Sequence, residues 1–146
     1  MNPDFKFPTL FTERMKNRLG SNFDDFSAAL QEEPPVAVRV NPSKWKIKVS
    51  AETVPWCSTG FYLRQRPLFT ADPCFHGGAY YVQEPSSMFL EQVFRSVQLS
   101  GQSNILDLCA APGGKTTHLL SLLKPDDLLV SNEVIRSRAV ILQENV

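Results

Sequence analysis

The stretch between Asn104 and Glu133 constrains the fold of this chain more than any other part. It opens with a short apolar run at residues 105–108, of the kind that forms a strand buried on both faces of a sheet. A glycine-containing turn at residues 109–115 leads into a leucine-rich helical pattern, and a second apolar run at residues 128–130 stops just before an acidic residue. Strand, glycine turn, helix and strand in this order predict the opening of an open α/β sheet that binds a nucleotide-like ligand.

The residue types in and after the turn suit a ligand site. Gly113 and Gly114 let the backbone approach a ligand closely and adopt dihedral angles that a side chain would forbid. The helix that they open presents unpaired N–H groups, which favour a carboxylate or a phosphate. Lys115 lies in the first helical turn, where the helix dipole disfavours a cation, so its presence indicates an anionic partner. Glu133 ends the next strand, where an acid can accept two hydrogen bonds from ribose hydroxyls.

Three classes of ligand compete for such a turn. A dinucleotide site requires G-x-G-x-x-G, and this turn holds only one glycine pair. A P-loop ends in Gly-Lys-Thr as this turn does, but Cys109 replaces its first glycine and Pro112 removes a backbone donor. A site for S-adenosylmethionine requires a turn that tolerates an amino-acid moiety, followed by a ribose-binding acid. A purely structural βαβ unit is the remaining interpretation, and it explains neither the glycine pair nor the acid.

The segment LDLCAAPGGKTTHL resembles the signature of the Nol/Nop/Sun family of S-adenosylmethionine-dependent RNA cytosine-5 methyltransferases. Residues 81–88, reading YVQEPSSM, and residues 131–133 together with Arg138 also resemble family segments. The resemblance implies that the turn and the acid that follows it bind S-adenosylmethionine. The cofactor-binding residues that it implies are Cys109, Ala110, Ala111, Pro112, Gly113, Gly114, Lys115 and Glu133.

The resemblance also implies a reaction, methylation of cytosine C5 in RNA, with ribosomal RNA as the expected substrate and partner. One cysteine would add to C6 of the pyrimidine, a second would help to release the product, and the base must leave its stack. The family's Pro-Cys and Thr-Cys motifs on later strands have no counterparts here, so no catalytic residue is predicted. Only two strands of a sheet of about five precede Val146. We therefore expect the N-terminal part of a longer enzyme, inactive alone.

The rest of the chain predicts a small α+β domain at residues 1–82, placed before the truncated methyltransferase domain at residues 83–146. We expect a helix from about Pro8 to Leu19 and another after Asn22. Strands are expected at residues 36–40, near 61–63 and at 79–82. Pro85 should start a further helix. Its expected apolar positions are Met88, Phe89, Val93 and Phe94.

Residues 44–49 alternate lysine with apolar side chains, which predicts a strand with Lys44, Lys46 and Lys48 on one face. A solvent-facing edge strand and an RNA-facing strip both explain this pattern. The sequence carries no net charge and has a pI near 6.7, which favours the first explanation. The family resemblance favours the second.

Gln83, Glu84 and Ser86 have two interpretations of their own: the resemblance places them at the mouth of an active site, and the local pattern makes them a strand end and a helix start. Cys74 follows a proline, like the nucleophile of cytosine-5 methyltransferases. It precedes the cofactor strand, however, so we expect a structural thiol.

No metal site is predicted, because Cys74 and His76 lack a second suitably spaced pair. We expect the three other candidate ligands, Cys57, Cys109 and His118, to be scattered.

Composition limits the remaining choices. The 146 residues are 42% hydrophobic, enough for one compact domain or for a small domain with part of another. The sequence has no membrane-length apolar run, no signal-peptide pattern and three widely spaced cysteines, which predict a cytoplasmic protein without a membrane partner. A non-catalytic RNA-binding fragment or adaptor remains the alternative to an enzyme, and a P-loop NTPase is the weaker enzymatic alternative.

Overall fold

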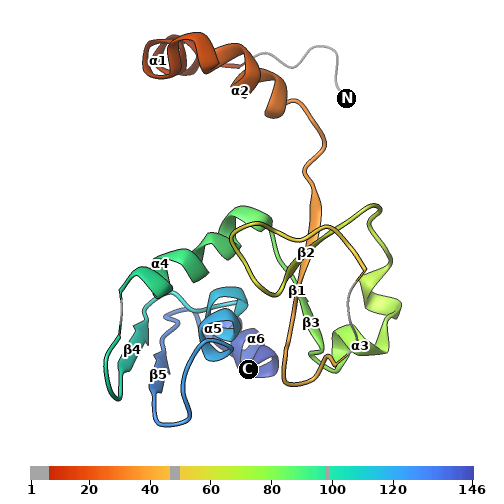
Figure 1. Ribbon diagram of the computed structural model, residues 1–146, viewed down its shortest axis with the longest axis vertical. Coiled ribbons are helices and arrows are strands. Elements are labelled where there is room, and N and C mark those ends of the chain that lie inside the picture. Colours follow the sequence, from red (N-terminus) through yellow and green to blue (C-terminus); the bar gives the residue numbers. More distant parts are fainter. Residues whose placement is uncertain (1–6, 47–49, 98) are drawn as a thin grey trace. The chain divides into compact units, whose positions relative to one another are not determined.

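A computed structural model describes residues 7–46, 50–97 and 99–146 (Figure 1). The described residues form two compact units, divided between Pro34 and Pro35. The first unit contains the helices α1 (Thr9–Leu19), η1 (Gly20–Asn22, a 3₁₀ turn) and α2 (Phe23–Ala29). Gly20 ends α1 with a φ of 55°, a left-handed value that glycine adopts without a steric penalty. The predicted first helix is therefore confirmed.

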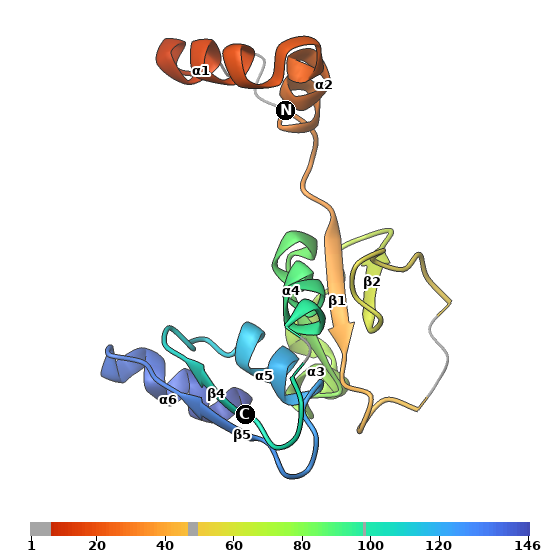
Figure 2. The ribbon, with the colours of Figure 1, turned by 60° about the vertical axis from the view of Figure 1, so that its left-hand side comes forward.

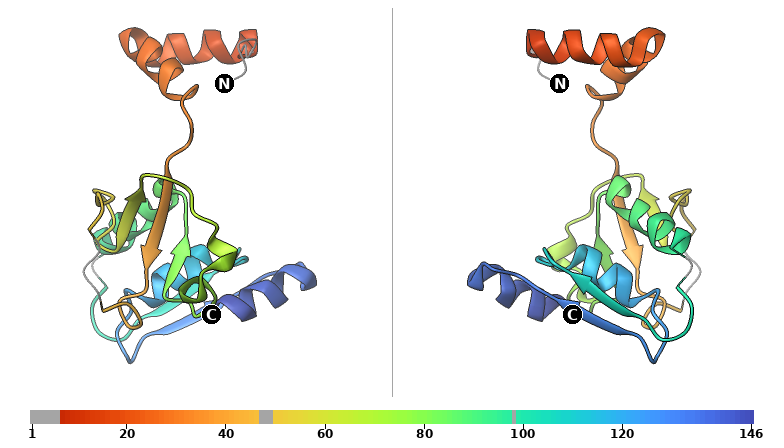
Figure 3. Two further views of the ribbon diagram at one scale, coloured as in Figure 1. Left: turned by 90° about the vertical axis from the view of Figure 1, so that its right-hand side faces the viewer. Right: turned by 90° about the vertical axis from the view of Figure 1, so that its left-hand side faces the viewer.

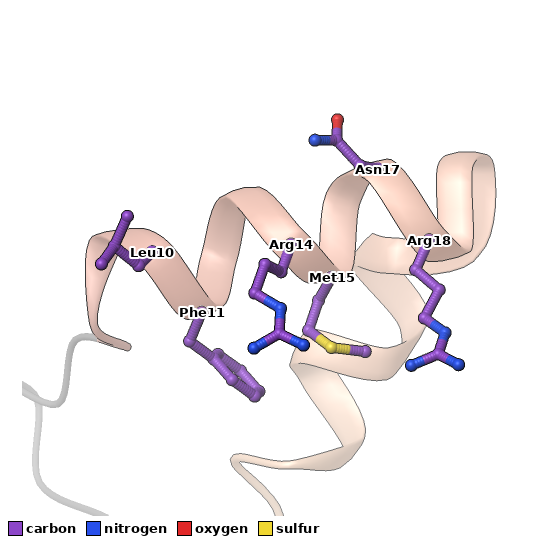
Figure 4. Close-up of a pocket in the computed structure, with 6 residues that line it drawn as sticks. All are labelled: Leu10, Phe11, Arg14, Met15, Asn17 and Arg18. Atoms are coloured by element: carbon purple, nitrogen blue, oxygen red, sulfur yellow. The ribbon is translucent and has the colours of Figure 1, made fainter.

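The two helices of the first unit meet through aromatic rings, with the ring centroids of Phe11 and Phe26 6.3 Å apart. Side chains of α1 also line a hollow on this unit (Figure 4). These side chains are Leu10, Phe11, Arg14, Met15, Asn17 and Arg18. All of them come from one helix, so no second element closes the hollow over a ligand, and it is not a candidate site.

The second unit begins with a three-stranded antiparallel sheet in the order β2-β1-β3 (Figure 2). Its strands are β1 (Val36–Val40), β2 (Gly60–Leu63) and β3 (Tyr80–Val82), as predicted to within a residue or two. The core on this sheet is formed by Ala37, Val54, Cys57 and Met88. Gly60 lies where a Cβ would come within 2.7 Å of Met88 Sδ, so glycine lets the chain pass this core.

Two short helical segments precede the connection to the second sheet. After η2 (Phe69–Ala71), α3 (Pro73–His76) starts at the cap Asp72, whose carboxylate accepts from the amide of Cys74. The helix expected from Pro85 is a 3₁₀ turn, η3 (Pro85–Phe89), continued by α4 (Leu90–Ser96). Met88 is fully buried, but Phe89 and Val93 are exposed, because α4 presents the face carrying Glu91 to the core.

The last part of the chain forms the predicted strand, turn, helix and strand. β4 (Asn104–Asp107) and β5 (Leu128–Ser131) pair in parallel, with α5 (Gly114–Leu120) between them in sequence and α6 (Arg136–Asn145) after them. Helix α5 lies between the two sheets of this unit (Figures 1 and 3). A small α+β region followed by the start of a Rossmann-like sheet is the fold class that the sequence predicted.

Two sequence-based expectations are wrong in detail. β4 is not buried on both faces, since Leu106 on that strand and Val130 on β5 are 57% and 49% exposed. Lys44 and Lys46 do not lie in a strand: the Asn41 side chain accepts from the amide of Ser43, and a turn follows. Lys48 and the rest of that predicted strand, residues 47–49, lie outside the described residues.

The domain boundary predicted between residues 82 and 83 stays a prediction. The chain passes from the first unit to the second after Pro34, between the end of α2 and the start of β1. In the described part of the chain, no helix combines the length and the apolar character that crossing a membrane requires.

Candidate cofactor site

The glycine turn is held on one side by the end of β5. The amide of Ala110 donates to the carbonyl of Asn132 at 3.0 Å, and the side-chain amide of Asn132 donates to the carbonyl of Leu108 at the same distance. The backbone N–H of Asn132 donates to the carbonyl of Asp107 at 2.8 Å. The turn between β4 and α5 is thus fixed at the carboxyl ends of two parallel strands, where ligands bind in open α/β sheets.

Asp107, the last residue of β4, shapes the turn from inside. Its Oδ2 accepts from the hydroxyl of Thr116 at 2.7 Å, and its Oδ1 accepts from the amide of Cys109 at 3.3 Å. Thr116 is only 1% exposed. The strand end and the first turn of α5 are therefore joined across the turn, and neither residue was singled out in the sequence. The sequence pattern that could have identified Asp107 and Thr116 is an acid at the end of a strand followed by a hydroxyl residue in the first turn of the next helix.

The glycine pair permits close packing by other parts of the chain. Gly113 has a φ of 116°, and a Cβ there would lie 3.2 Å from Asn145 Cβ in α6. A Cβ on Gly114 would lie 3.2 Å from the ring of Tyr81 in β3. Gly113 therefore favours glycine because of its backbone conformation, and Gly114 because a side chain would crowd the Tyr81 ring, both for reasons that do not depend on a ligand. The sequence-based argument that the glycines admit a ligand did not include these contacts, and it stays a prediction.

The predicted site residues divide into buried and accessible members. Ala110 and Ala111 pack on Leu142 of α6, whereas Cys109, Pro112 and Lys115 are exposed. The backbone amides of residues 114–116 have no hydrogen-bond acceptor among the described residues. Three adjacent free donors beside an exposed lysine can bind the carboxylate of an amino-acid ligand.

Glu133 lies just beyond β5 and is linked to the turn by Arg138, which contacts both. One carboxylate oxygen accepts from the amide of Ile135 at 3.0 Å, and the other lies 3.5 Å from Arg138 Nη1. The Glu133 side chain is 5% exposed. Each oxygen retains a lone pair for a further donor such as a ribose hydroxyl. The residues present fit S-adenosylmethionine: free amides for its amino-acid end and a fixed carboxylate for its ribose.

Other residues weighed in the sequence have structural partners. Glu84 caps η3 by accepting from the amides of Ser86 and Ser87, and from the Ser86 hydroxyl, which lowers the pKa of this carboxyl. Gln83 is buried and accepts from Arg39. Cys74 is exposed within the single turn of α3.

A buried cluster joins α4, α5 and the loop before β2. His118 Nε2 lies 3.3 Å from Glu91 Oε2 and 3.7 Å from Cys57 Sγ, and one ligand-type atom of each residue falls within a 4.8 Å span. The expectation that Cys57 and His118 are scattered is therefore wrong. Arg95 and Ser58 also donate to Glu91.

The geometry of this cluster favours a structural role. Glu91 and Cys57 approach the same nitrogen of His118, whereas a catalytic relay places the acid and the nucleophile on opposite nitrogens. His118 Nδ1 is buried and has no hydrogen-bond partner among the residues that the structure describes, whereas a metal-bound histidine ordinarily donates its second N–H. Burial would raise the pKa of Glu91, but hydrogen bonds from Arg95 and Ser58 outweigh it and lower this pKa to about 2. Burial raises the pKa of the Cys57 thiol and lowers that of His118.

A cleft of about 860 Å³ lies beside the antiparallel sheet, on the flank of α5 that carries Thr117, Leu120 and Ser121. Tyr81 and Lys44 also line it. None of the predicted cofactor residues does. Cleft size alone therefore does not identify the cofactor site, and the turn geometry is the better guide.

Two family models match the chain. Residues 7–85 match the N-terminal domain of 16S rRNA methyltransferase RsmF, and residues 96–146 match 16S rRNA methyltransferase RsmB/F. The chain is 31% identical over 162 aligned residues to ribosomal RNA small subunit methyltransferase F of Vibrio campbellii, covering 100% of this chain and 34% of that protein. It is 37% identical over 114 residues to the Aeromonas hydrophila protein of the same name, covering 74% of this chain and 23% of that protein.

Solved structures agree with the sequence comparisons. A methyltransferase homologue from Pyrococcus horikoshii superposes with a TM-score of 0.73 at 28% sequence identity, covering 95% of this chain and 50% of that chain. The fold and the turn thus define a methyltransferase-type α/β protein, as the sequence resemblance predicted.

Within that class, the chain belongs to the RsmF family of 16S rRNA methyltransferases, whose N-terminal domain model covers more than half of it. It spans about a third of the length of its curated Vibrio relative.

Proposed function

We propose that the complete protein is an S-adenosylmethionine-dependent methyltransferase that modifies cytosine C5 in small-subunit ribosomal RNA. The observation that carries this proposal is the turn itself: the residues of the family signature sit at the carboxyl ends of two parallel strands and present free amides. The family match over both parts of the chain supports the RNA substrate. The relatives named above are ribosomal RNA small subunit methyltransferases.

In this proposal, residues 109–115 and Glu133 hold the cofactor, which supplies an electrophilic methyl group when bound. The free amides of residues 114–116 and the exposed Lys115 bind its carboxylate. Glu133, fixed by Ile135 and Arg138, accepts from the ribose. No residue of this chain is assigned to nucleophilic attack, and ribosomal RNA is the proposed partner.

Binding and transfer to RNA test the proposal together. The full-length protein is titrated with S-adenosylmethionine by calorimetry and then incubated with small-subunit RNA and methyl-labelled cofactor. We expect cofactor binding and 5-methylcytosine in the RNA digest by mass spectrometry. Cofactor binding without methyl transfer would support a non-catalytic RNA adaptor. Tight ATP binding in place of S-adenosylmethionine would favour a P-loop NTPase. Either result would overturn the proposal.

A further inference from the structure

Arg39, the fourth of the five residues of β1, is a buried cation without an anionic partner. Arg39 is only 3% exposed. No carboxylate of the described residues lies within ion-pair distance of its guanidinium. Burial lowers the pKa of its guanidinium to about 10, so it remains charged at neutral pH. A lone buried charge is costly unless hydrogen bonds compensate it, so its partners indicate its role.

The partners of Arg39 are mostly on α5, the helix that begins at the glycine turn. Nη2 donates to the hydroxyl of Thr117 at 2.7 Å and to the carbonyl of Gly114 at 3.2 Å. Nε donates to Gln83 Oε1 at 2.9 Å, just beyond β3. The planar guanidinium thus bridges the antiparallel sheet and the first turn of α5, which a flexible ammonium with one nitrogen cannot do.

The connection continues into the turn. The Thr117 hydroxyl that accepts from Arg39 donates in turn to the carbonyl of Gly113 at 2.8 Å. Gly113 is the residue with the left-handed backbone. Arg39 is therefore linked to both glycines of the signature, to Gly114 directly and to Gly113 through one hydroxyl.

A second side chain from the same sheet acts on the same glycine. Tyr81 of β3 is the direct register partner of Arg39 across the β1–β3 pair. A Cβ on Gly114 would lie 3.2 Å from Cε1 of the Tyr81 ring, closer than an ordinary van der Waals contact. Gly114 therefore has a guanidinium on its carbonyl and an aromatic ring on the side where a Cβ would project.

We infer that Arg39, with Tyr81 beside it, is a positioning residue for cofactor binding: it fixes the glycine turn without touching the cofactor. This inference rests on the proposed function, because the turn must be the cofactor site. A contact between the antiparallel sheet and α5 that only stabilised the fold could be made by apolar side chains, with a smaller desolvation penalty. A buried guanidinium aimed at helix carbonyls instead fixes orientation as well as distance.

The test separates affinity from stability in the full-length protein. Arg39→Ala removes the bridge, and Val38→Ala weakens the same strand at the adjacent buried residue, whose side chain points to the opposite face of the sheet from Arg39. We expect Arg39→Ala to raise the Kd for S-adenosylmethionine at least about tenfold, equivalent to about 1.4 kcal/mol. Val38→Ala should lower the melting temperature yet leave that Kd within about twofold.

Two further variants keep the test decisive if Arg39→Ala does not fold. Thr117→Val is nearly isosteric and removes the acceptor of the shortest Arg39 bond. Arg39→Lys keeps the charge, but its single ammonium cannot make all the hydrogen bonds of the planar guanidinium. Both should weaken cofactor binding, with the KM for cofactor rising more than the KM for RNA. An unchanged Kd in these variants, or an equal rise in Val38→Ala, would overturn the inference while wild-type binding leaves the proposed function standing. A wild type that does not bind S-adenosylmethionine would overturn both.

Discussion

Arg138 Nη1 lies 3.5 Å from Glu133 Oε2, and Nη2 of the same side chain donates to the carbonyl of Ala111 at 2.6 Å. One side chain of α6 thus connects the acid after β5 with the turn after β4. The two parts of the candidate site are separated by more than a helix in sequence, and Arg138 joins them in addition to the backbone and side-chain bonds of Asn132. Glu133 is accordingly fixed before any ligand arrives, which reduces the cost of ordering it on binding.

The first prediction concerns that acid. Glu133→Ala in the full-length protein should weaken S-adenosylmethionine binding by about 1.5–3 kcal/mol, because it removes charge-assisted hydrogen bonds to the ribose. Asp126→Ala removes an exposed carboxylate before β5 and serves as the matched control. Calorimetry measures both. Equal affinities in the wild type and Glu133→Ala would rule out the ribose role.

The sequence predicted those parts of the fold whose signals are local. The turn, its two flanking strands and the terminal acid are contiguous in sequence, and capping signals such as Gly20 and Pro85 lie at the element ends. The Arg39 bonds to Gly114 and Thr117 span 75 and 78 positions. No local sequence pattern predicts a contact over such a separation. An arginine between two valines indicates only a residue of a strand.

Burial was the second source of error, for a different physical reason. Periodicity identifies an apolar face but not what covers it, so Leu106 was expected to be buried and is exposed. Conversely, Glu91 is buried because Arg95, Ser58 and His118 satisfy its carboxylate. The compensation for a buried charge comes from several elements at once and is visible only in three dimensions.

A second prediction separates the cysteines. Cys74→Ser in the full-length enzyme should leave methyl transfer to RNA unchanged, because this exposed thiol lies in the α3 turn, not in the candidate site. Cys57→Ser should also retain transfer, with a lower melting temperature, because a hydroxyl replaces a buried thiol beside His118. Turnover assays and thermal unfolding test both. Loss of turnover in Cys74→Ser with cofactor binding intact would instead identify a catalytic thiol.

A third prediction follows from the low pKa of His118. Burial and the positive charge of Arg39 lower this pKa against the opposing effect of Glu91. An unfolded histidine, with a pKa near 6.5, then takes up a proton more readily than the folded one. Stability should therefore be full above about pH 7 and decline as the pH falls below about 6.5.

The measurement is the free energy of unfolding of the full-length protein between pH 8 and pH 5. His118→Gln keeps a donor for Glu91 and should flatten the decline. Equal slopes in the wild type and His118→Gln would contradict the assignment. At lower pH, Glu91 contributes stability above about pH 4.5 that is lost as the pH falls towards 2.

The last prediction concerns residues 1–146 expressed alone. Four apolar side chains on and beside the parallel pair are about half exposed or more. They are Leu106, Leu108, Leu128 and Val130. A two-stranded sheet with such a surface promotes association in water, because burying apolar area is favourable and two strands give little independent stability.

We therefore expect this polypeptide to self-associate in light scattering and to bind S-adenosylmethionine much more weakly than the full-length protein. Leu106→Lys with Val130→Lys, which places charges on the exposed strand positions, should reduce the association. A stable monomer that binds the cofactor as tightly as the full-length protein would show that the parallel pair and its turn form a complete site without further strands.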